Sequence, residues 1–411
     1  MTPDTTAKPA RVNLRRPDIM AVVRDEVEQH YRSQIVEQLR ARGGVLEAGG
    51  LKVRLAKEFG FCYGVERAID LAYAARRVFQ DKHIYILGEI IHNPEVNEQL
   101  LAMNIRYLSG THRSAALDQV TAEDVVIIPA FGAPVPVMER LRAVGCQLVD
   151  TTCGDVMSVW KRVTQNAKEQ FTSIIHGKAQ HEETLATSSR AVAGQSVAHY
   201  LVVLNLAEAD WVCDYIRHGG DKLAFLEKFK GAHSPGFDPD RDLASIGVAN
   251  QTTMLRSETE EIQRHLQQAM ADRYGAENIA QHYRMFDTIC GATQERQDAL
   301  LKLLDEPLHL MIVVGGYNSS NTSHLAELSE ARVPTFFIKN ASEIISATVI
   351  RHHNLHRQTE VQTVDWLPAG PLYVGITAGA SCPNNLIDET ICRLFELRGV
   401  DAAGVLAATQ P

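Results

Sequence analysis

The stretch Asp150-Thr151-Thr152-Cys153-Gly154 lies between an apolar run typical of a strand end and a run with helical periodicity. The same residues recur, apart from Ile289, in Asp287-Thr288-Ile289-Cys290-Gly291. The stretch Phe59-Gly60-Phe61-Cys62-Tyr63-Gly64 has different residues around its cysteine but the same position between a strand-like and a helix-like run. Each turn carries one thiol between a strand and a helix, which predicts three similar units that present a triangle of sulfurs. Soft thiolate ligands select iron–sulfur clusters, zinc or copper, and a helix N-terminus favours the thiolate form. The pattern therefore indicates a metal centre.

The composition is that of a globular protein with more than one domain. A chain of 411 residues exceeds what one hydrophobic core usually holds. The net charge of −9 argues against a nucleic-acid partner, which needs a clustered basic excess. No apolar run approaches the ~20 residues of a spanning helix, so we expect no membrane partner. Seven cysteines do not suggest a disulfide framework, so we expect a cytoplasmic location, or the plastid stroma if a transit peptide has been removed.

Strand-like and helix-like segments alternate along most of the chain. This alternation predicts parallel α/β units, with their sites at the carboxyl ends of the strands. We expect an N-terminal extension at 1–50 and domains at 51–153, 154–289 and 290–411. The expected strands are Ile84–Leu87, Asp124–Ile128, Ser173–Ile175, Tyr200–Leu204, Leu310–Val314, Thr335–Ile338 and Leu372–Ile376. The expected helices are Val65–Phe79, Val135–Val144, Val156–Glu169, Glu258–Tyr274, Glu295–Leu304 and Asn384–Leu397.

Three further segments have distinctive compositions. In the extension, Pro17 and Asp18 can open one helix that runs to about Arg42. Residues 213–245 are rich in Gly, Lys, Asp and Pro, which predicts an insertion or long loop within the second domain. The tail 399–411 is small and Ala-rich, and we expect it to fray.

The cysteines do not all fit the same interpretation. A lone cysteine is usually a small buried hydrophobe, which suits Cys146, Cys213 and Cys392. The turn cysteines fit this poorly because each has glycine close by. Zinc usually shows paired ligands such as C-x₂-C, which this chain lacks. Three isolated cysteines suit a cubane cluster with one iron left open to substrate, although their spacing alone leaves the metal undecided.

Two histidines follow apolar strands and are candidate site residues. In Ile175-His176-Gly177-Lys178-Ala179-Gln180-His181-Glu182-Glu183-Thr184, His181 and Glu183 lie two apart and would share a face in extended backbone. A carboxylic acid in a closed pocket can hold a proton, and histidine can donate to phosphate. A solvated polar loop is equally compatible with this stretch. His92 ends another strand, where histidine is more often structural than a ligand.

Three other strand ends carry short polar side chains. Val313-Val314-Gly315-Gly316-Tyr317-Asn318-Ser319-Ser320-Asn321-Thr322-Ser323 runs from a strand through glycines to a helix start, which is typical of an anion site. It lacks the Gly-Lys-Ser/Thr ending of a Walker A loop, and ordinary N-capping would explain part of it. Gly375-Ile376-Thr377-Ala378-Gly379-Ala380-Ser381-Cys382-Pro383 repeats the design, and Gly247-Val248-Ala249-Asn250-Gln251-Thr252-Thr253 is a third case.

Together these motifs resemble the LytB/IspH family of 4-hydroxy-3-methylbut-2-enyl diphosphate reductases, which belongs to the non-mevalonate isoprenoid pathway. The resemblance covers roughly residues 53–398. The extension and Pro129-Ala130-Phe131-Gly132-Ala133 resemble the plant and cyanobacterial branch. The matching motifs, in family order, are Gly60-Phe61-Cys62-x-Gly64-Val65, Ile91-His92-Asn93, Asp150-Thr151-Thr152-Cys153, His181-x-Glu183, Gln251-Thr252-Thr253, Asn318-Ser319-Ser320-Asn321 and Thr377-Ala378-Gly379-Ala380-Ser381.

The resemblance implies a clover-like arrangement of three α/β domains, with mostly parallel sheets, around one oxygen-sensitive [4Fe–4S] cluster held by Cys62, Cys153 and Cys290. The reaction would be the reductive dehydroxylation of (E)-4-hydroxy-3-methylbut-2-enyl diphosphate to isopentenyl and dimethylallyl diphosphate, the last step of the pathway. Ferredoxin or flavodoxin would donate the electrons. Glu183 would be the proton source, and His181 and Thr252 would order the proton path. The substrate-binding residues would be His92, His181, Thr252, Ser319, Ser320, Asn321 and Ser381.

Two positions depart from the family pattern. Phe131 stands where many bacterial members have a second diphosphate histidine, so one donor is absent or replaced. Gly154 follows the second ligand where the family usually has proline. Since proline is pre-organised for a helix start, glycine predicts a looser turn around Cys153. Cys382, beside Ser381, is expected to be a spectator thiol.

Two other functions share some of these features. A cluster-dependent dehydratase also leaves one iron open, but it turns over without a reduced donor, whereas a reductase is inert without one. A degenerate cluster-bearing redox sensor needs no diphosphate site, so the glutamate, histidine and serine set argues against it.

Overall fold

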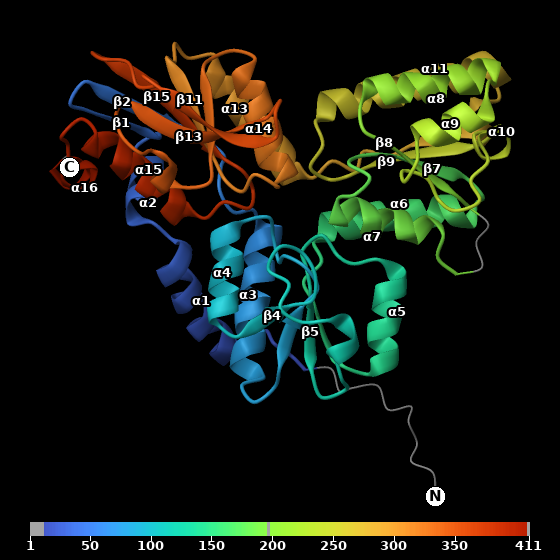
Figure 1. Ribbon diagram of the computed structural model, residues 1–411, viewed down its shortest axis with the longest axis horizontal. Coiled ribbons are helices and arrows are strands. Elements are labelled where there is room, and N and C mark those ends of the chain that lie inside the picture. Colours follow the sequence, from blue (N-terminus) through green and yellow to red (C-terminus); the bar gives the residue numbers. More distant parts are fainter. Residues whose placement is uncertain (1–11, 195–197, 409–411) are drawn as a thin grey trace, which may run out of the picture. The chain divides into compact units, whose positions relative to one another are not determined.

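The computed structural model describes residues 12–194 and 198–408 (Figure 1). Their internal contacts group them into two compact units. The first unit comprises Asp81–Gly88 and Arg106–Cys290, and the second comprises Asn13–Gln80, Glu89–Ile105 and the chain from Gly291 onward. No helix among the described residues combines the length and apolarity needed to cross a bilayer.

The described strands form three sheets, most of whose pairings are parallel. One sheet has the order β4 (Ile105–Tyr107), β3 (Ile84–Ile86), β5 (Val125–Ile128) and β6 (Gln147–Asp150). A second, all parallel, has the order β10 (Tyr283–Met285), β9 (Ile246–Asn250), β7 (Thr172–His176) and β8 (Tyr200–Val203). The third has the order β1 (Val45–Ala48), β2 (Leu51–Leu55), β15 (Leu372–Ala378), β11 (Leu310–Val314), β12 (Thr335–Ile338), β13 (Val349–Asn354) and β14 (Thr359–Val364).

These sheets confirm the predicted α/β class with mostly parallel sheets. In the third sheet β2, β15, β11 and β12 are parallel, whereas β1, β13 and β14 are attached by antiparallel pairing. The strand β2, at the start of the predicted domain 51–153, pairs with β15 near the end of the chain. The three domain boundaries and the clover-like arrangement stay predictions.

Helices follow most strands, as the alternation predicts. β11, β12 and α5 have the predicted bounds. The helices are α1 (Pro17–Tyr31), α2 (Gln34–Ala41), α3 (Tyr63–Val78), α4 (Pro94–Ala102), α5 (Val135–Val144), α6 (Gly154–Lys168), α7 (Glu182–Ala191), α8 (Leu206–His218), α9 (Lys222–Lys228), α10 (Pro239–Asp242), α11 (Arg256–Tyr274), α12 (Ile279–His282), α13 (Gly291–Leu304), α14 (Ser320–Glu330), α15 (Asn384–Glu396) and α16 (Ala402–Ala408), with 3₁₀ turns η1 (Leu117–Gln119) and η2 (Ala341–Glu343).

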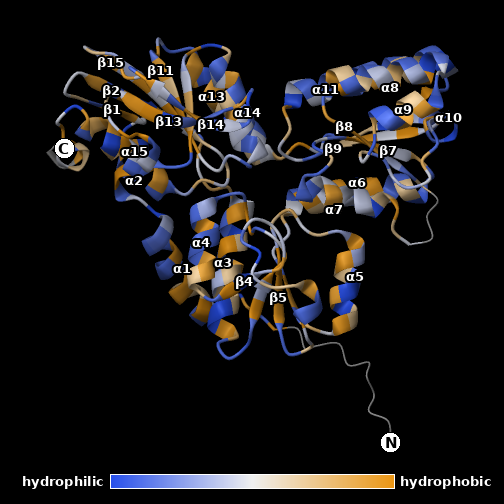
Figure 2. Cartoon of the chain, in the orientation of Figure 1, coloured by the Kyte–Doolittle hydropathy of each residue, from blue (hydrophilic) through white to orange (hydrophobic). Residues whose placement is uncertain are grey.

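The sheet of β7, β8 and β9 is covered on both faces. Figure 1 shows α6 and α7 on one side of it and α8 and α11 on the other, in agreement with their contacts. Every residue of β7 and β9 is buried, as expected for a parallel sheet between two helix layers. Figure 2 shows the hydrophobic colour on these strands and hydrophilic colour on the outer helix surfaces.

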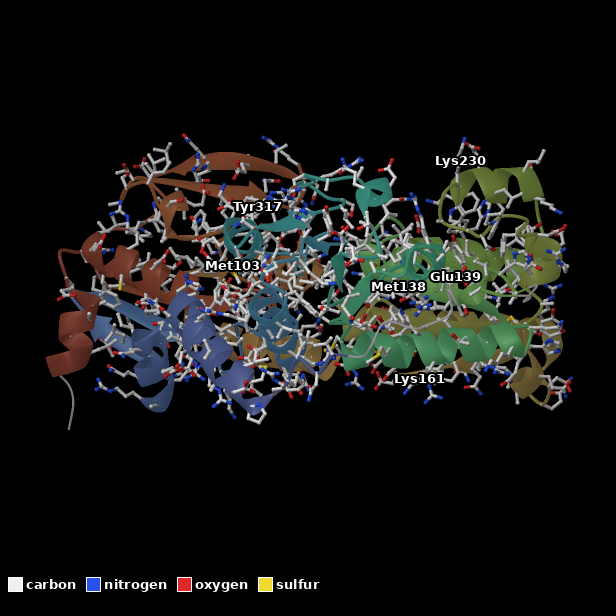
Figure 3. The ribbon with its side chains drawn as sticks, turned by 90° about the horizontal axis from the view of Figure 1, so that it is seen from below. Met103, Met138, Glu139, Lys161, Lys230 and Tyr317 are labelled. Carbon is white, nitrogen blue, oxygen red and sulfur yellow. The ribbon has the colours of Figure 1, made fainter. Side chains whose placement is uncertain are left out.

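Helices outside this layer also show separate buried and exposed faces. Met138 of α5 is buried in the core beside β5, whereas its neighbour Glu139 is exposed. Figure 3 labels both side chains, together with the exposed Lys161 and Lys230. Such a division follows from the 3.6-residue period of an amphipathic helix.

Residues 17–41 of the extension form two helices, so the prediction of one continuous helix from Pro17 to about Arg42 was wrong. Helix α1 ends at Tyr31 because Arg32 adopts extended backbone. Ser33 then caps α2, since its hydroxyl accepts the N–H of Val36 at 3.1 Å. The same hydroxyl donates to Asp388 of α15 at 2.6 Å, which fixes the bend against the third sheet's helix layer.

Two other expectations were also wrong in part. Residues 213–245 are not a long loop: α8 extends to His218, and α9 and α10 follow, with Phe225, Phe229 and Phe237 buried in the core of the second sheet. In the tail, residues 402–408 form α16, and Leu406 packs into the core of the third sheet at 1% exposure. Apolar contacts distant in sequence order both segments. Residues 409–411 lie outside the described chain.

A buried carboxylate in η2 makes the stability of the second unit depend on pH. Glu343 is 0% exposed and lies 2.9 Å from Lys339, and Arg351 also pairs with it. Burial alone would raise the pKa of Glu343, but hydrogen bonds from Arg351 and Lys339 lower it below the ordinary 4.5. A lowered folded-state pKa stabilises the fold above the unfolded value, and this contribution is lost as the pH falls through the folded value.

We therefore expect Glu343→Gln to lower the free energy of unfolding at pH 7 by about 1.5–3 kcal/mol, the range for hydrogen bonds to charged groups. Urea titrations at pH 7 and near pH 3 measure this, and the difference between the two proteins should be smaller at the lower pH. Glu360→Gln is the matched control, because exposed Glu360 pairs with the same Lys339 and should lose roughly 0–1 kcal/mol. An equal loss for Glu343→Gln at both pH values would contradict the assignment.

Candidate metal centre and active site

The three turn cysteines stand at helix N-termini. Cys62 is the N-cap of α3, Cys153 is the N-cap of α6, and Cys290 directly precedes α13. Each backbone N–H donates to a carbonyl beyond the end of a strand: Cys62 to Ala380 at 3.2 Å, Cys153 to Ala130 at 2.8 Å and Cys290 to Thr252 at 3.2 Å. The three thiols therefore share one construction, with a strand-end loop behind and a helix dipole ahead.

The remaining cysteines have different surroundings. Cys146, Cys213 and Cys382 are buried, whereas the three turn cysteines are partly exposed. Cys392 is also partly exposed, so the expectation of a buried thiol was wrong for it, but it lies within α15 and not at a helix N-terminus. Burial raises the pKa of the Cys213 thiol to about 12, and it also raises the pKa of Cys382, which fits the expectation of a spectator thiol. Three accessible thiols at helix N-termini are a donor set that fits an iron–sulfur cluster. Cys62 belongs to the second unit and the other two to the first, so their convergence stays a prediction.

The loop before Cys62 is held by two guanidinium groups. Arg296 of α13, only 4% exposed, donates to the carbonyl of Gly60 at 2.7 and 3.2 Å. Arg40 of α2 donates to the carbonyl of Phe59 at 2.8 Å and stacks over its ring at 4.0 Å. Gly60 has a φ of +77°, and a side chain there would approach Asn384 to 2.8 Å. The conformation of this turn therefore depends on Gly60 and on the hydrogen bonds from Arg296 and Arg40.

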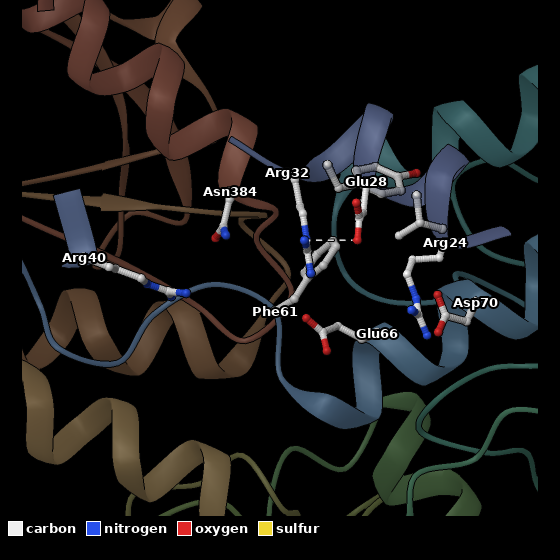
Figure 4. Close-up of a pocket in the computed structure, with 10 residues that line it drawn as sticks. Arg24, Glu28, Arg32, Arg40, Phe61, Glu66, Asp70 and Asn384 are labelled. Carbon is white, nitrogen blue, oxygen red and sulfur yellow. Dashed lines mark ion pairs between the residues drawn. The ribbon is translucent and has the colours of Figure 1, made fainter. Parts of the chain in front are cut away.

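The extension contributes an aromatic contact and a polar cavity beside the same loop. The ring of Tyr31 packs edge-on against Phe61 at 5.7 Å. The adjoining cavity has a volume of about 230 Å³. Among the residues that line it are Arg40, Phe61 and Glu66, which Figure 4 labels. Residues 17–42 thus pack directly against the segment that carries the first predicted ligand.

Glu183 is connected to Cys290 through a single residue. Glu183 is 3% exposed, and its Oε1 accepts the N–H of Thr252 at 2.6 Å. The carbonyl of Thr252 in turn accepts the N–H of Cys290 at 3.2 Å. Strand β9 ends at Asn250, so its end holds both the predicted acid and the turn of a predicted cluster ligand. The polar residues predicted after this strand therefore include one, Thr252, that hydrogen-bonds to both segments.

His181 caps the helix that carries Glu183. Its Nδ1 accepts the N–H of Glu183 at 3.2 Å, so in the neutral ring Nε2 carries the hydrogen. The ring of Phe131 lies edge-on to this imidazole at 6.2 Å. Phe131 therefore contacts a predicted site residue, although it cannot donate a hydrogen bond as a histidine would.

Gly154 occupies an ordinary first position of helix α6. A side chain there would meet no atom within 4 Å, and its φ is not in the left-handed region. The turn around Cys153 is held by the bond from its N–H to Ala130. The expected loosening of this turn stays a prediction.

The second unit gathers the predicted diphosphate residues. Ser381 Oγ lies 3.2 Å from the carbonyl of His92 and 3.3 Å from Ser319 Oγ. Ser319 caps α14, and Asn321 accepts the N–H of Ala380 at 2.9 Å through Oδ1. Within the described chain the buried Nδ2 of Asn321 has no hydrogen-bond partner. A buried donor at a helix N-terminus fits an anionic ligand.

Close backbone packing brings these segments together. Gly316 lies so near His92 that a Cβ at this glycine would be 2.4 Å from the His92 carbonyl oxygen. Gly316, just after β11, therefore permits contact with the loop after β3. Ser320, which follows the N-cap Ser319, is also buried, at 2% exposure.

Sequence reasoning missed residues that support the predicted diphosphate site. Glu89, 6% exposed, lies 3.0 Å from His92 and accepts a hydrogen bond from Asn318 at 2.8 Å. Separately, in the first unit, Gln251 of the predicted Gln251-Thr252-Thr253 motif accepts from the N–H of Lys178 and the hydroxyl of Thr184, both at 3.1 Å. The Glu89-x-x-His92 spacing was a visible signal, since it places a carboxylate within reach of the histidine in a turn.

Fold and site together define an α/β protein with thiols at three helix N-termini and a polar anion site. A family model described as LytB protein matches residues 53–395, so the chain belongs to the LytB family. A 4-hydroxy-3-methylbut-2-enyl diphosphate reductase of Gloeobacter violaceus is 51% identical over 395 residues, with 95% of this chain and 93% of the relative covered. One of Thermosynechococcus vestitus is 49% identical over 379 residues, with 92% of each covered.

Solved structures agree with the fold. A structure of (E)-4-hydroxy-3-methyl-but-2-enyl diphosphate reductase, described as the terminal enzyme of the non-mevalonate pathway, matches with a TM-score of 0.50 and 26% identity, over 84% of this chain and 99% of that one. A reductase structure from Plasmodium falciparum has a TM-score of 0.59 at 22% identity, over 82% and 86%. The likeness to the latter concerns the fold alone.

Proposed function

We propose that this chain catalyses the reductive dehydroxylation of (E)-4-hydroxy-3-methylbut-2-enyl diphosphate, the last step of the non-mevalonate isoprenoid pathway. The substrate gains two electrons and two protons, its allylic C–O bond breaks, and the products are water and isopentenyl or dimethylallyl diphosphate. The names of relatives about half identical over nearly the whole chain support this reaction. The observation that carries it is the link from Glu183 through Thr252 to Cys290.

Cys62, Cys153 and Cys290 would hold a [4Fe–4S] cluster. When bound, this group supplies electrons singly and an open iron that acts as a Lewis acid toward the allylic hydroxyl group. The shared setting of the three thiols at helix N-termini supports the assignment, because each helix dipole favours the anionic ligand.

Glu183 is the proposed proton source for the departing hydroxyl group. Because its Oε1 accepts the Thr252 N–H at 2.6 Å, a proton on this carboxyl group must sit on Oε2. Oε2 can then donate to the substrate oxygen, which leaves as water. His181, whose Nδ1 accepts the N–H of Glu183, fixes the start of α7 and presents Nε2–H as a further donor.

The diphosphate would be bound by the polar residues that lie together in the second unit. Asn321 offers its buried Nδ2, and the N-terminus of α14 adds backbone N–H groups around Ser319 and Ser320. Ser381 and His92 border the same space. Neutral donors suffice in a pocket from which water is excluded, since a low dielectric strengthens each hydrogen bond.

The experiment that tests the reaction separates it from a dehydratase by its electron demand. Protein purified without oxygen is incubated with the substrate, with and without a chemically reduced dye, and both diphosphate products are followed. Products are expected only with the reduced dye. Turnover without it would favour the dehydratase, and an iron–sulfur protein that forms no product in either condition would favour a redox sensor. Ferredoxin or flavodoxin as natural donor and the cytoplasmic location stay predictions.

Arg40 ties the extension to the Cys62 loop, so its loss should weaken cluster retention. Arg40→Ala removes the hydrogen bond to Phe59 and is expected to lower the free energy of unfolding by about 1–2 kcal/mol. Iron release to a chelator under anaerobic conditions should become faster. Arg42→Ala is the control, because Arg42 donates instead to the carbonyl of Leu406 at 3.0 Å. Equal iron-release rates in the two variants would refute the role of Arg40.

A further inference from the structure

A buried carboxyl group lies beside a predicted diphosphate residue. Glu89 and His92 have side chains only 8% and 10% exposed, and Oε2 of Glu89 is 3.0 Å from Nδ1 of His92. Asn318 Nδ2 donates to the same Oε2 at 2.8 Å. Glu89 therefore receives two donors on one oxygen, one from each of two segments far apart in the chain.

The positions of the hydrogens follow from these distances. A carboxylate oxygen accepts, so Nδ1 of His92 must carry the hydrogen that points to Glu89. Asn318 Nδ2 lies 3.4 Å from the same Nδ1, but both atoms are donors, so this approach is not a hydrogen bond. Glu89 thus fixes both the tautomer and the rotation of the imidazole ring.

The backbone around Glu89 is itself rigid. Asn97, 0% exposed, accepts the N–H of Ile90 at 3.2 Å and donates to the carbonyls of Ile91 and Asn93 at 2.9 Å each. Asn93 caps α4 through the N–H of Val96. One buried side chain therefore holds the turn from Ile90 to Asn93, which directly follows Glu89 and leads to His92.

We infer that Glu89 is a positioning residue for recognition of the diphosphate, acting by orienting His92. The inference rests on the proposed function, in which His92 borders the diphosphate. His92 shares the polar cluster of Ser381 and Ser319 at the start of α14. An oriented ring presents its remaining nitrogen in one direction, whereas an unrestrained ring must be ordered when the ligand binds.

Whether diphosphate affinity falls or rises when Glu89 is replaced distinguishes a positioning role from a purely electrostatic one. Glu89 is an acid near an anion site, so electrostatics alone predicts that its removal strengthens diphosphate binding. Positioning predicts the opposite. By analogy with metal sites, where losing the partner of a histidine costs roughly 10–100-fold, we expect Glu89→Ala to weaken binding about tenfold.

A double-mutant cycle tests this with inorganic pyrophosphate as the probe. Calorimetry on the anaerobic, cluster-loaded protein gives the affinity for wild type, Glu89→Ala, His92→Ala and the double variant. Glu89→Ala should weaken binding in the wild-type background and change nothing further when His92 is absent. Steady-state kinetics should show a raised KM with kcat little changed. Glu89→Gln, which keeps an accepting oxygen, should lose less and serves if Glu89→Ala does not fold.

Glu95→Ala is the matched control, because this half-buried carboxyl group on α4 accepts from Asn340 at 3.3 Å instead. Its pyrophosphate affinity should equal that of wild type. Tighter binding by Glu89→Ala, or equal losses with and without His92, would overturn the inference while the reductase assignment stands. If wild type binds pyrophosphate and the cycle behaves as expected but no product forms, the proposed function fails and the role of Glu89 in binding holds. A wild type that does not bind pyrophosphate overturns the inference, whereas turnover of the allylic diphosphate with the reduced dye decides the proposed function separately.

Discussion

Cys290→Ser is expected to abolish the visible iron–sulfur absorbance of the anaerobically purified protein and, with it, turnover. A serine hydroxyl is a hard, mostly protonated donor, whereas a cluster needs soft thiolates. The change keeps the N–H bond of residue 290 to Thr252, so the fold around it should persist. Iron and sulfide content, the visible spectrum and turnover under a reduced dye measure the effect.

Cys392→Ser is the matched control for this variant. Cys392 is also partly exposed, but it lies within α15 and donates to Asp388 at 3.3 Å, a bond that serine can keep. It should retain iron, sulfide and turnover. Wild-type iron content and activity in Cys290→Ser would refute the ligand assignment, and a colourless wild type that contains zinc would refute the cluster.

Glu183→Gln is expected to keep the cluster and the substrate affinity but to lower kcat by about 10²–10⁴-fold, the usual contribution of a general acid. Glutamine is isosteric, and its amide oxygen can still accept the N–H of Thr252, so the end of β9 should stay in place. The amide cannot deliver the proton that the departing hydroxyl group needs. Single-turnover kinetics with pre-reduced protein measure this step directly.

Glu208→Gln gives the control for Glu183. Like Glu183, Glu208 lies in the first turn of a helix and its carboxyl group accepts a backbone N–H, here that of Leu204 at 2.8 Å. The helix is α8, which carries none of the predicted site residues. The kcat of Glu208→Gln should be that of wild type. A Glu183→Gln protein with unchanged kcat would remove Glu183 from the proton path, whatever the fate of the cluster.

Features encoded within one short segment could be predicted from the sequence. The strand–turn–helix pattern around Cys153 needs only local alternation, and the helix begins at Gly154 directly after the thiol. The uniformly apolar β11 has its predicted bounds for the same reason. The polar strand ends at Ser319 and Ser381 were also visible locally, and they contact one another.

Features that depend on distant partners could not. The strand β2 contains Lys52 and Arg54 and forms because β15, far along the chain, pairs with it. The bend after α1 is fixed by Asp388 of α15. Glu89 acquires its importance only once Asn318 is folded against it. Tertiary contacts decide these elements, so local propensity carries little information about them.

The electron stoichiometry of turnover tests the central claim most directly. Anaerobic protein is given a known amount of (E)-4-hydroxy-3-methylbut-2-enyl diphosphate and a one-electron dye, and oxidised dye and both products are counted together. The account predicts two dye molecules oxidised for each molecule of isopentenyl or dimethylallyl diphosphate formed. Product formation without dye oxidation, or dye oxidation without loss of the allylic hydroxyl group, would contradict it.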